Sequence, residues 1–164
     1  MTLWRISRYA DLSGEGGRRA SGRWHTRGRR VVYLSDHPAT CLLEMLVQVG
    51  HSGNVPLTYQ WLEVDTSGLD VAEVKSLPDD WRGRPDATRA VGDGWLTGAG
   101  APLLKVPAVV APATFNYLLN PAHHAARGCR ITASVAYPVD QRLARPAAPS
   151  APKGGRPYSS TMSP

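Results

Sequence analysis

The segment from Ser21 to Leu46 constrains the fold of this chain more than any other, because it joins three unlike pieces. An arginine-rich turn comes first, a short β-branched run that includes Tyr33 follows, and an apolar helix ends the segment. The helix carries one carboxylate, Glu44, among apolar neighbours. Glutamate is rarely buried without a partner, so an acid on an apolar helix face needs either a partner or a chemical role.

Two interpretations of Glu44 follow from the local sequence. In the first, its carboxylate pairs with an arginine of the preceding turn. In the second, Glu44 and Arg23 face one pocket as a catalytic acid and an anion-binding group. Arg23 stands between Gly22 and Trp24, which distinguishes it from the neighbouring arginines of a solvated basic loop. Arginine suits paired hydrogen bonds to phosphate or carboxylate.

The chain has 164 residues, a length that suits one domain with its own core. Its formal net charge is +6. The arginine cluster is compatible with nucleic acid, a dinucleotide pyrophosphate or an acidic protein. No apolar run reaches membrane-spanning length, and the N-terminus has no apolar segment typical of a secretory signal. Cys41 and Cys129 lack metal-ligand spacing. We therefore expect a cytoplasmic protein that binds neither a membrane nor a metal.

Hydrophobic periodicity predicts short strands and few helices. The expected strands lie at 3–6, 30–34, 58–64, 102–110 and 131–137, the helices at 39–49 and 87–96, a glycine-rich loop at 11–21 and a compact turn at 115–121. Without regular strand–helix–strand alternation, this order favours an α+β fold with small mixed or antiparallel sheets. Proline, alanine and serine dominate from residue 144, so we expect one domain over 1–143 and a disordered tail over 144–164.

Eight short motifs follow one another along the chain. They are Trp4-Arg5-Ile6, Gly22-Arg23-Trp24, Val31-Val32-Tyr33, the apolar residues around Glu44, Gly92 to Leu96, Leu104 to Pro107, Asn116 to His123 and Asp140 to Leu143. In this order they resemble the RES domain, the toxin half of bacterial Xre–RES toxin–antitoxin pairs. That family is named for an arginine, a glutamate and a serine. Arg23 matches the arginine and Glu44 the glutamate.

Two positions depart from the family pattern. The family serine normally follows Val-Pro, and that position here is Ala108. His25 stands where the family usually has asparagine. If the missing hydroxyl binds substrate, its loss costs activity. The chain would then be a weakened enzyme that acts mainly by binding its antitoxin.

The resemblance implies an ADP-ribosyltransferase-like fold with NAD as substrate and no metal. It implies cleavage of the nicotinamide–ribose bond by hydrolysis or phosphorolysis, or transfer of ADP-ribose to a protein. The implied partner is an Xre-type helix-turn-helix antitoxin, with nucleic acid contacted only through it, and a homodimer is compatible with the pattern. A small basic nucleic-acid-binding protein is the alternative from another class. That alternative predicts exposed aromatic residues among the arginines and gives Glu44 no role.

The implied chemistry assigns a task to each candidate residue. Breaking the glycosidic bond builds positive charge on the ribose, which the Glu44 carboxylate would stabilise. Arg23 would hold the pyrophosphate, with Arg5 as a second candidate unless it forms a surface ion pair. The Tyr33 ring would stack on the cationic nicotinamide, unless it is an ordinary core aromatic. His25 either contacts the ligand or makes a structural hydrogen bond.

Overall fold

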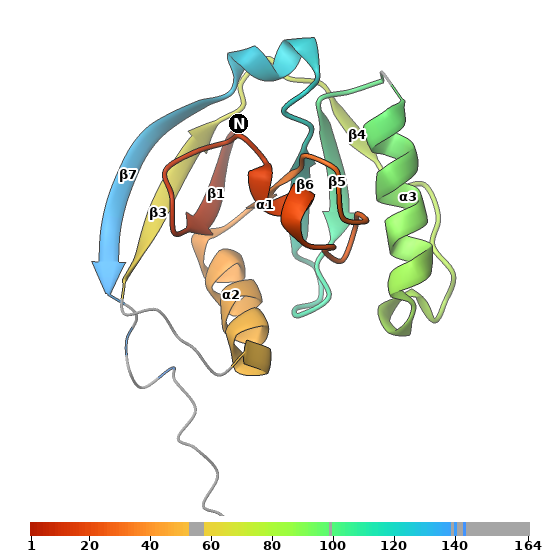
Figure 1. The fold of residues 1–164 in the computed structure, drawn as a ribbon, viewed down its shortest axis with the longest axis horizontal. Coiled ribbons are helices and arrows are strands. Elements are labelled where there is room, and N and C mark those ends of the chain that lie inside the picture. The colour runs from red at the N-terminus through yellow and green to blue at the C-terminus, as the bar shows by residue number, and fades with distance from the viewer. Residues whose placement is uncertain (53–57, 99, 139, 141–142, 144–164) are drawn as a thin grey trace, which may run out of the picture.

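The computed structural model describes residues 1–52, 58–98, 100–138, 140 and 143 (Figure 1). Within these residues the chain forms one seven-stranded mixed sheet, three α-helices and two short 3-10 helices. The expected α+β class is confirmed, although the strands join in a single sheet instead of several small ones. No helix in the described part is long and apolar enough to cross a membrane. The tail over 144–164 lies outside the described residues.

The sheet order places the N-terminal strand near the middle. Across the sheet the strands are β4 (Val71–Glu73), β5 (Leu103–Pro107), β6 (Phe115–Leu119), β2 (Val32–Ser35), β1 (Thr2–Ser7), β3 (Thr58–Asp65) and β7 (Arg130–Pro138). Neighbouring strands are antiparallel except for β4 and β5. In Figure 1, β7 forms one edge of the curved sheet and β4 lies at the other, beside the helix α3 (Pro85–Thr97).

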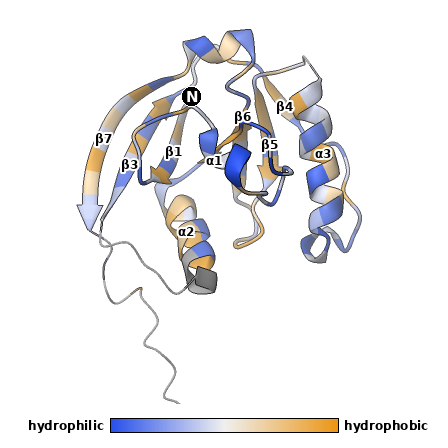
Figure 2. Ribbon diagram, in the orientation of Figure 1, coloured by the Kyte–Doolittle hydropathy of each residue, from blue (hydrophilic) through white to orange (hydrophobic). Residues whose placement is uncertain are grey.

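Two apolar clusters form because successive residues of a strand point to opposite faces of the sheet. On β5, Leu103 belongs to one cluster, whereas Leu104 and Val106 belong to the other. The helix α2 (Pro38–Ser52) contacts β1 and β2, and the short helix α1 (Glu15–Arg19) precedes β2. Figure 2 shows that α1 is strongly hydrophilic, whereas β5 and β6 consist largely of apolar residues.

Two local predictions were wrong. The segment 115–121 was expected as a turn, but Phe115–Leu119 forms β6, which pairs with β5 on one side and β2 on the other. Hydrogen bonds to two neighbouring strands outweigh the turn preference of its asparagine. The segment 11–21 was expected as a loop, but it contains α1, whose glycine Gly17 packs tightly against the following loop.

Candidate functional site

A pocket of about 390 Å³ lies among α2, β1, β2 and the loop that precedes β2. Its volume falls in the range of small-molecule sites, roughly 300–1,000 Å³. The lining includes four of the predicted site residues, Arg5, Arg23, Tyr33 and Glu44, together with Arg8, Ser35 and Asn116. We call this space the inner pocket. His25 and Ala108 are not among its lining residues.

Glu44 is held in the inner pocket by an amide and not by an arginine. Its Oε1 accepts a hydrogen bond of 2.8 Å from Nδ2 of Asn116, and Oδ1 of Asn116 accepts one of 2.6 Å from Oγ of Ser35. Ser35 and Asn116 are directly paired residues of β2 and β6, and both are buried. Since no described residue forms an ion pair with Glu44, the first interpretation, pairing with an arginine, is wrong.

The chemistry of these groups fixes the orientation of the Asn116 amide. An ionised carboxylate can only accept hydrogen bonds, so the NH₂ group of Asn116 must face Glu44. The amide oxygen then faces Ser35, whose hydroxyl can donate. One carboxylate lone pair is thereby occupied, and the other oxygen of Glu44 is available to a ligand. The pair Ser35–Asn116 was missed in the sequence because neither residue has a local signal of its role.

Arg23 is anchored through one of its three nitrogens. Its Nη2 donates to the carbonyl oxygens of Trp81 and Arg82 at 2.8 and 2.5 Å. The guanidinium carbon lies 5.7 Å from the centre of the Trp81 ring. Nε is buried and has no partner among the described residues. The terminal Nη1 is therefore the group of Arg23 that remains for an anion.

Arg5 is a partly buried cation, and it forms no ion pair with any described residue. Its Nη1 donates to the carbonyl of Tyr33 at 3.3 Å, and its Nη2 donates to Oγ of Ser7 at 3.4 Å. Burial lowers the pKa of Arg5, partly offset by the negative charge of Asp11. Because a buried charge without a paired acid is costly, an anionic ligand in the inner pocket would stabilise this arginine.

His25 and Tyr33 share a fully assigned hydrogen-bond network. Nε2 of His25 lies 3.1 Å from the carbonyl oxygen of Ala20 and 3.3 Å from that of Gly17. Carbonyls only accept, so Nε2 carries the proton and Nδ1 accepts from the Tyr33 hydroxyl at 2.8 Å. That hydroxyl accepts in turn from the backbone N–H of Trp24. The Tyr33 hydroxyl is therefore occupied by hydrogen bonds to the loop that contains Trp24 and His25, and Tyr33 also lines the inner pocket.

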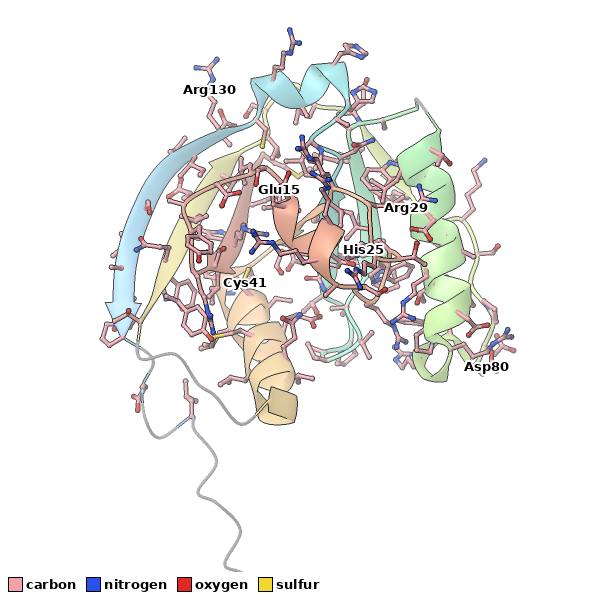
Figure 3. The ribbon with its side chains drawn as sticks, in the orientation of Figure 1. Glu15, His25, Arg29, Cys41, Asp80 and Arg130 are labelled. Atoms are coloured by element: carbon pink, nitrogen blue, oxygen red, sulfur yellow. The ribbon has the colours of Figure 1, made fainter. Side chains whose placement is uncertain are left out.

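His25 has a structural position, which is the second of its two interpretations. Its side chain is 3% exposed, and burial lowers its pKa below the ordinary value of 6.5. Burial also raises the pKa of Tyr33. In Figure 3, His25 and Cys41 lie toward the middle of the molecule, whereas Asp80 and Arg130 extend from its edge.

We expect the buried imidazole to make stability depend on pH. In the unfolded chain His25 takes up a proton near pH 6.5, but the folded protein resists protonation at that pH. The free energy of unfolding should therefore fall as the pH drops below 6.5. Chemical denaturation at a series of pH values should show a smaller slope for His25→Asn. The exposed control His124→Asn should keep the full slope, and equal slopes in both variants would contradict the assignment.

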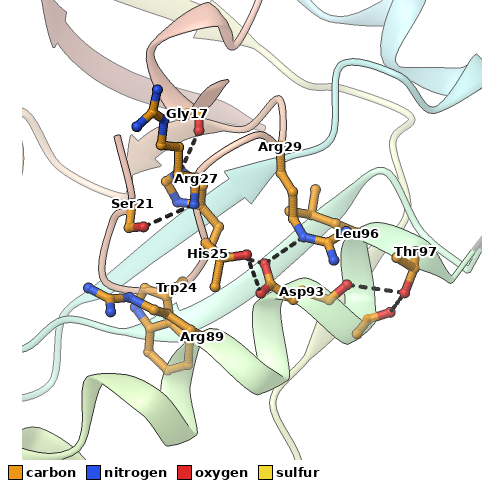
Figure 4. A network of polar contacts seen from close by, with 12 residues as sticks. Gly17, Ser21, Trp24, His25, Arg27, Arg29, Arg89, Asp93, Leu96 and Thr97 are labelled. Carbon is orange, nitrogen blue, oxygen red and sulfur yellow. Dashed lines mark hydrogen bonds and ion pairs between the residues drawn. The ribbon is translucent and has the colours of Figure 1, made fainter. Parts of the chain in front are cut away.

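The helix α3 clamps the loop that carries Arg23 (Figure 4). Asp93 accepts hydrogen bonds from the backbone N–H and the hydroxyl of Thr26 at 3.0 and 2.8 Å, and it forms an ion pair with Arg29 at 3.0 Å. The Thr88 hydroxyl donates to the carbonyl of Arg23 at 2.7 Å. These contacts fix the backbone on both sides of Trp24, so they determine where Arg23 enters the inner pocket.

The arginine cluster does not resemble a nucleic-acid surface. Arg18 and Arg30 both pair with Glu15, and Arg29 pairs with Asp93. Trp24, the aromatic residue within the cluster, is 1% exposed and cannot stack on a base. The exposed aromatics that a nucleic-acid-binding protein requires are therefore missing from this part of the described chain.

Ala108 is buried and is not among the residues that line the inner pocket. Its backbone N–H donates to the carbonyl of Thr114 at 3.0 Å. The next residue, Val109, lines the pocket. Among the described residues, no group of three or more His, Cys, Asp or Glu side chains is arranged to hold a metal ion.

Comparisons with known proteins agree on one family. A family model described as "RES domain" matches residues 2–140. The chain is 42% identical over 133 residues to "Toxin Res" of Pseudomonas putida, which covers 80% of this chain and 92% of that protein. It is 31% identical over 159 residues to "Prs ADP-ribosylating toxin" of Sphingobium sp., with 89% and 98% covered.

A solved structure supports the fold independently. In the Mycobacterium tuberculosis MbcT–MbcA toxin–antitoxin complex, one chain superposes with a TM-score of 0.70 over 84% of both chains. The sequence identity is 20%, so this likeness concerns the fold alone.

Proposed function

Since the chain belongs to the RES domain family, we propose that it is the toxin of a toxin–antitoxin pair and that it cleaves NAD between nicotinamide and ribose. The observation that carries this proposal is the Glu44 carboxylate, held by Asn116 in a pocket that also contains the cations Arg5 and Arg23. A fixed anion beside two partly buried cations suits a substrate with a cationic ring at one end and phosphates further along.

The proposed reaction breaks the bond between C1′ of the ribose and the nicotinamide nitrogen. The bonding electrons leave with the nitrogen, which makes nicotinamide neutral, and positive charge develops on the ribose. Glu44 stabilises that charge through its free carboxylate oxygen. Nη1 of Arg23 and the guanidinium of Arg5 bind phosphate oxygens, and the Tyr33 ring packs against the nicotinamide. Water, which releases one proton to solvent, or phosphate then forms the new bond to C1′.

A protein acceptor is the second candidate. The Sphingobium relative named "Prs ADP-ribosylating toxin" is matched over 98% of its length, which favours transfer of ADP-ribose to a protein side chain. The toxin role also calls for an inhibitory partner. The structural neighbour was solved as a toxin–antitoxin complex, and we propose an Xre-type antitoxin for this chain.

The first test is NAD turnover by the purified chain, read as nicotinamide release. Because Val109 and not Ala108 lines the inner pocket, we expect turnover with alanine in place, and Ala108→Ser should change kcat by less than about threefold. Free ADP-ribose would identify water as acceptor, and ADP-ribose phosphorylated at C1 would identify phosphate. No release from either form, with phosphate and with candidate acceptor proteins, would leave the weakened antitoxin-binding domain as the better description.

Asn116 provides a second test, because it positions Glu44 without contacting the substrate in our scheme. Asn116→Asp places a second carboxylate next to Glu44, and two carboxylates in one site retain a shared proton to higher pH. We expect the acid limb of the kcat–pH profile to move up by about one unit or more. Asn116→Leu removes the hydrogen bond to the carboxylate without adding charge, so it should lower kcat and move the limb by less than Asn116→Asp does. A limb unchanged in both variants would rule out this positioning role.

A further inference from the structure

A second, smaller pocket adjoins the inner pocket. Its volume is about 170 Å³, and it shares the lining residues Ile6, Met45 and Tyr59 with the inner pocket. Its far wall is formed by Trp61 of β3 and Tyr137 of β7. We call this space the outer pocket. Ile6, Met45 and Tyr59 pack against one another, so the two pockets lie side by side on a common apolar wall, and an extended ligand that crosses this wall can reach both.

The outer pocket suits a flat aromatic group. The rings of Trp61 and Tyr137 lie edge to face, with centres 6.4 Å apart. A dry apolar cavity of roughly 150 Å³ is known to hold a benzene molecule, so the space here accommodates one aromatic ring system that projects in part from the opening. Stacking on aromatic side chains is the usual way in which proteins bind a nucleobase without reading its sequence.

An exposed cation of the inner pocket acts on Tyr59, a residue of the wall that the two pockets share. Arg8 lines the inner pocket and is exposed, and within the described residues it forms no hydrogen bond or ion pair. Its positive charge acts on Tyr59, whose pKa is raised by burial and lowered in part by Arg8. Since Tyr59 lines both pockets, Arg8 is placed to bind an anion that passes between them.

The direction of the substrate follows from Glu44. The carboxylate must face the ribose that carries nicotinamide. Glu44 lines the inner pocket and does not line the outer pocket. The other half of NAD must therefore extend away from Glu44. A phosphate-linked ligand that leaves the inner pocket past Tyr59 meets Arg8 first and the aromatic outer pocket next.

We propose that the outer pocket is the adenine subsite of this protein and that Arg8 binds the phosphates linking the two halves of NAD. This proposal rests on the proposed function. It assigns specificity to residues outside the inner pocket: Trp61 and Tyr137 select a dinucleotide over a mononucleotide.

The test compares Tyr137→Ala with Val135→Ala, two substitutions at exposed positions on the edge strand β7. Tyr137 and Val135 are 58% and 55% exposed, but only Tyr137 lines the outer pocket. We expect Tyr137→Ala to raise KM for NAD roughly fivefold or more, with kcat retained and with cleavage of nicotinamide mononucleotide unchanged. Val135→Ala should match the parent chain with both substrates. Equal losses on NAD and the mononucleotide would overturn the adenine assignment while leaving NAD cleavage intact.

Binding of adenosine monophosphate tests the subsite without catalysis. Titration calorimetry should show binding to the parent chain that Tyr137→Ala weakens about fivefold or more. Arg8→Gln should remove the preference for the monophosphate over adenosine. No binding of the monophosphate to a chain that cleaves NAD would overturn the subsite. The subsite would also be overturned if Tyr137→Ala bound the nucleotide normally but bound the antitoxin more weakly. The outer pocket would then hold a side chain of the antitoxin. A chain that cleaves no NAD in any condition would refute the proposed function instead.

Discussion

Replacing Glu44 by glutamine will lower kcat for nicotinamide release about 10²–10³-fold, the usual cost of removing one preorganised electrostatic group. The amide keeps the shape of the carboxylate, and its oxygen can still accept the 2.8 Å hydrogen bond from Asn116. The substitution therefore removes charge without removing the contact that holds the side chain. Initial rates at saturating NAD measure the effect, and thermal melting should show a Tm close to that of the parent chain.

The matched control is Glu73→Gln. Glu73 lies on β4, pairs with Lys105 at 2.9 Å and does not line the inner pocket. The substitution Glu73→Gln removes one carboxylate, as Glu44→Gln does, so it controls for the change in net charge. Its kcat should be unchanged. If Glu44→Gln kept more than about a tenth of the parent kcat, Glu44 would not be the group that stabilises the ribose cation.

Much of the fold was predictable because its signals are local. The alternation in β3 and the apolar stripe of α2 identify those elements without knowledge of their neighbours. β6 was not predictable in the same way. Its asparagine favours a turn, and its strand conformation depends on β5 and β2, which lie before it in the chain and on either side of it in the sheet.

The residues of the candidate site also differ in whether a local sequence signal identifies them. Glu44 and Arg23 were identified because a carboxylate in an apolar helix and an arginine in a tight turn are unusual in themselves. Ser35 and Asn116 are ordinary polar residues separated by 81 positions. They meet because β2 and β6 pair in a register that sets them opposite each other. That register is a property of the whole sheet, so the support of Glu44 could not be inferred from any local pattern.

The support of Arg23 is equally remote from it in sequence. α3 follows the loop by more than sixty positions, as in the hydrogen bond from Thr88 to the Arg23 carbonyl, which spans 65. The closest approach is made by Gly92. A Cβ atom at that position would lie 1.8 Å from the carbonyl oxygen of Trp24 and 2.8 Å from its carbonyl carbon. Glycine is thus required where the helix meets the backbone next to Arg23.

Gly92→Ala should consequently be the most destabilising small substitution in this region. Overpacking costs about 1–3 kcal/mol and occasionally more, and the obstacle here is backbone, which cannot move aside by rotating a side chain. We expect the free energy of unfolding to fall by about 3 kcal/mol or more, and Tm by roughly 6–12 °C at 2–4 °C per kcal/mol. Denaturant titration and thermal melting measure both quantities.

Gly94→Ala, two residues along the same helix, distinguishes a steric effect from a general effect on α3. A Cβ at Gly94 meets nothing within 4 Å, and alanine stabilises a helix interior by about 0.5–1 kcal/mol relative to glycine. The two variants should therefore change stability in opposite directions. Gly92→Ala should also raise KM for NAD in whatever protein remains folded, because the carbonyl that it displaces belongs to the residue after Arg23. Equal stability of both variants would mean that the helix yields easily, and the clamp would then not determine where Arg23 lies.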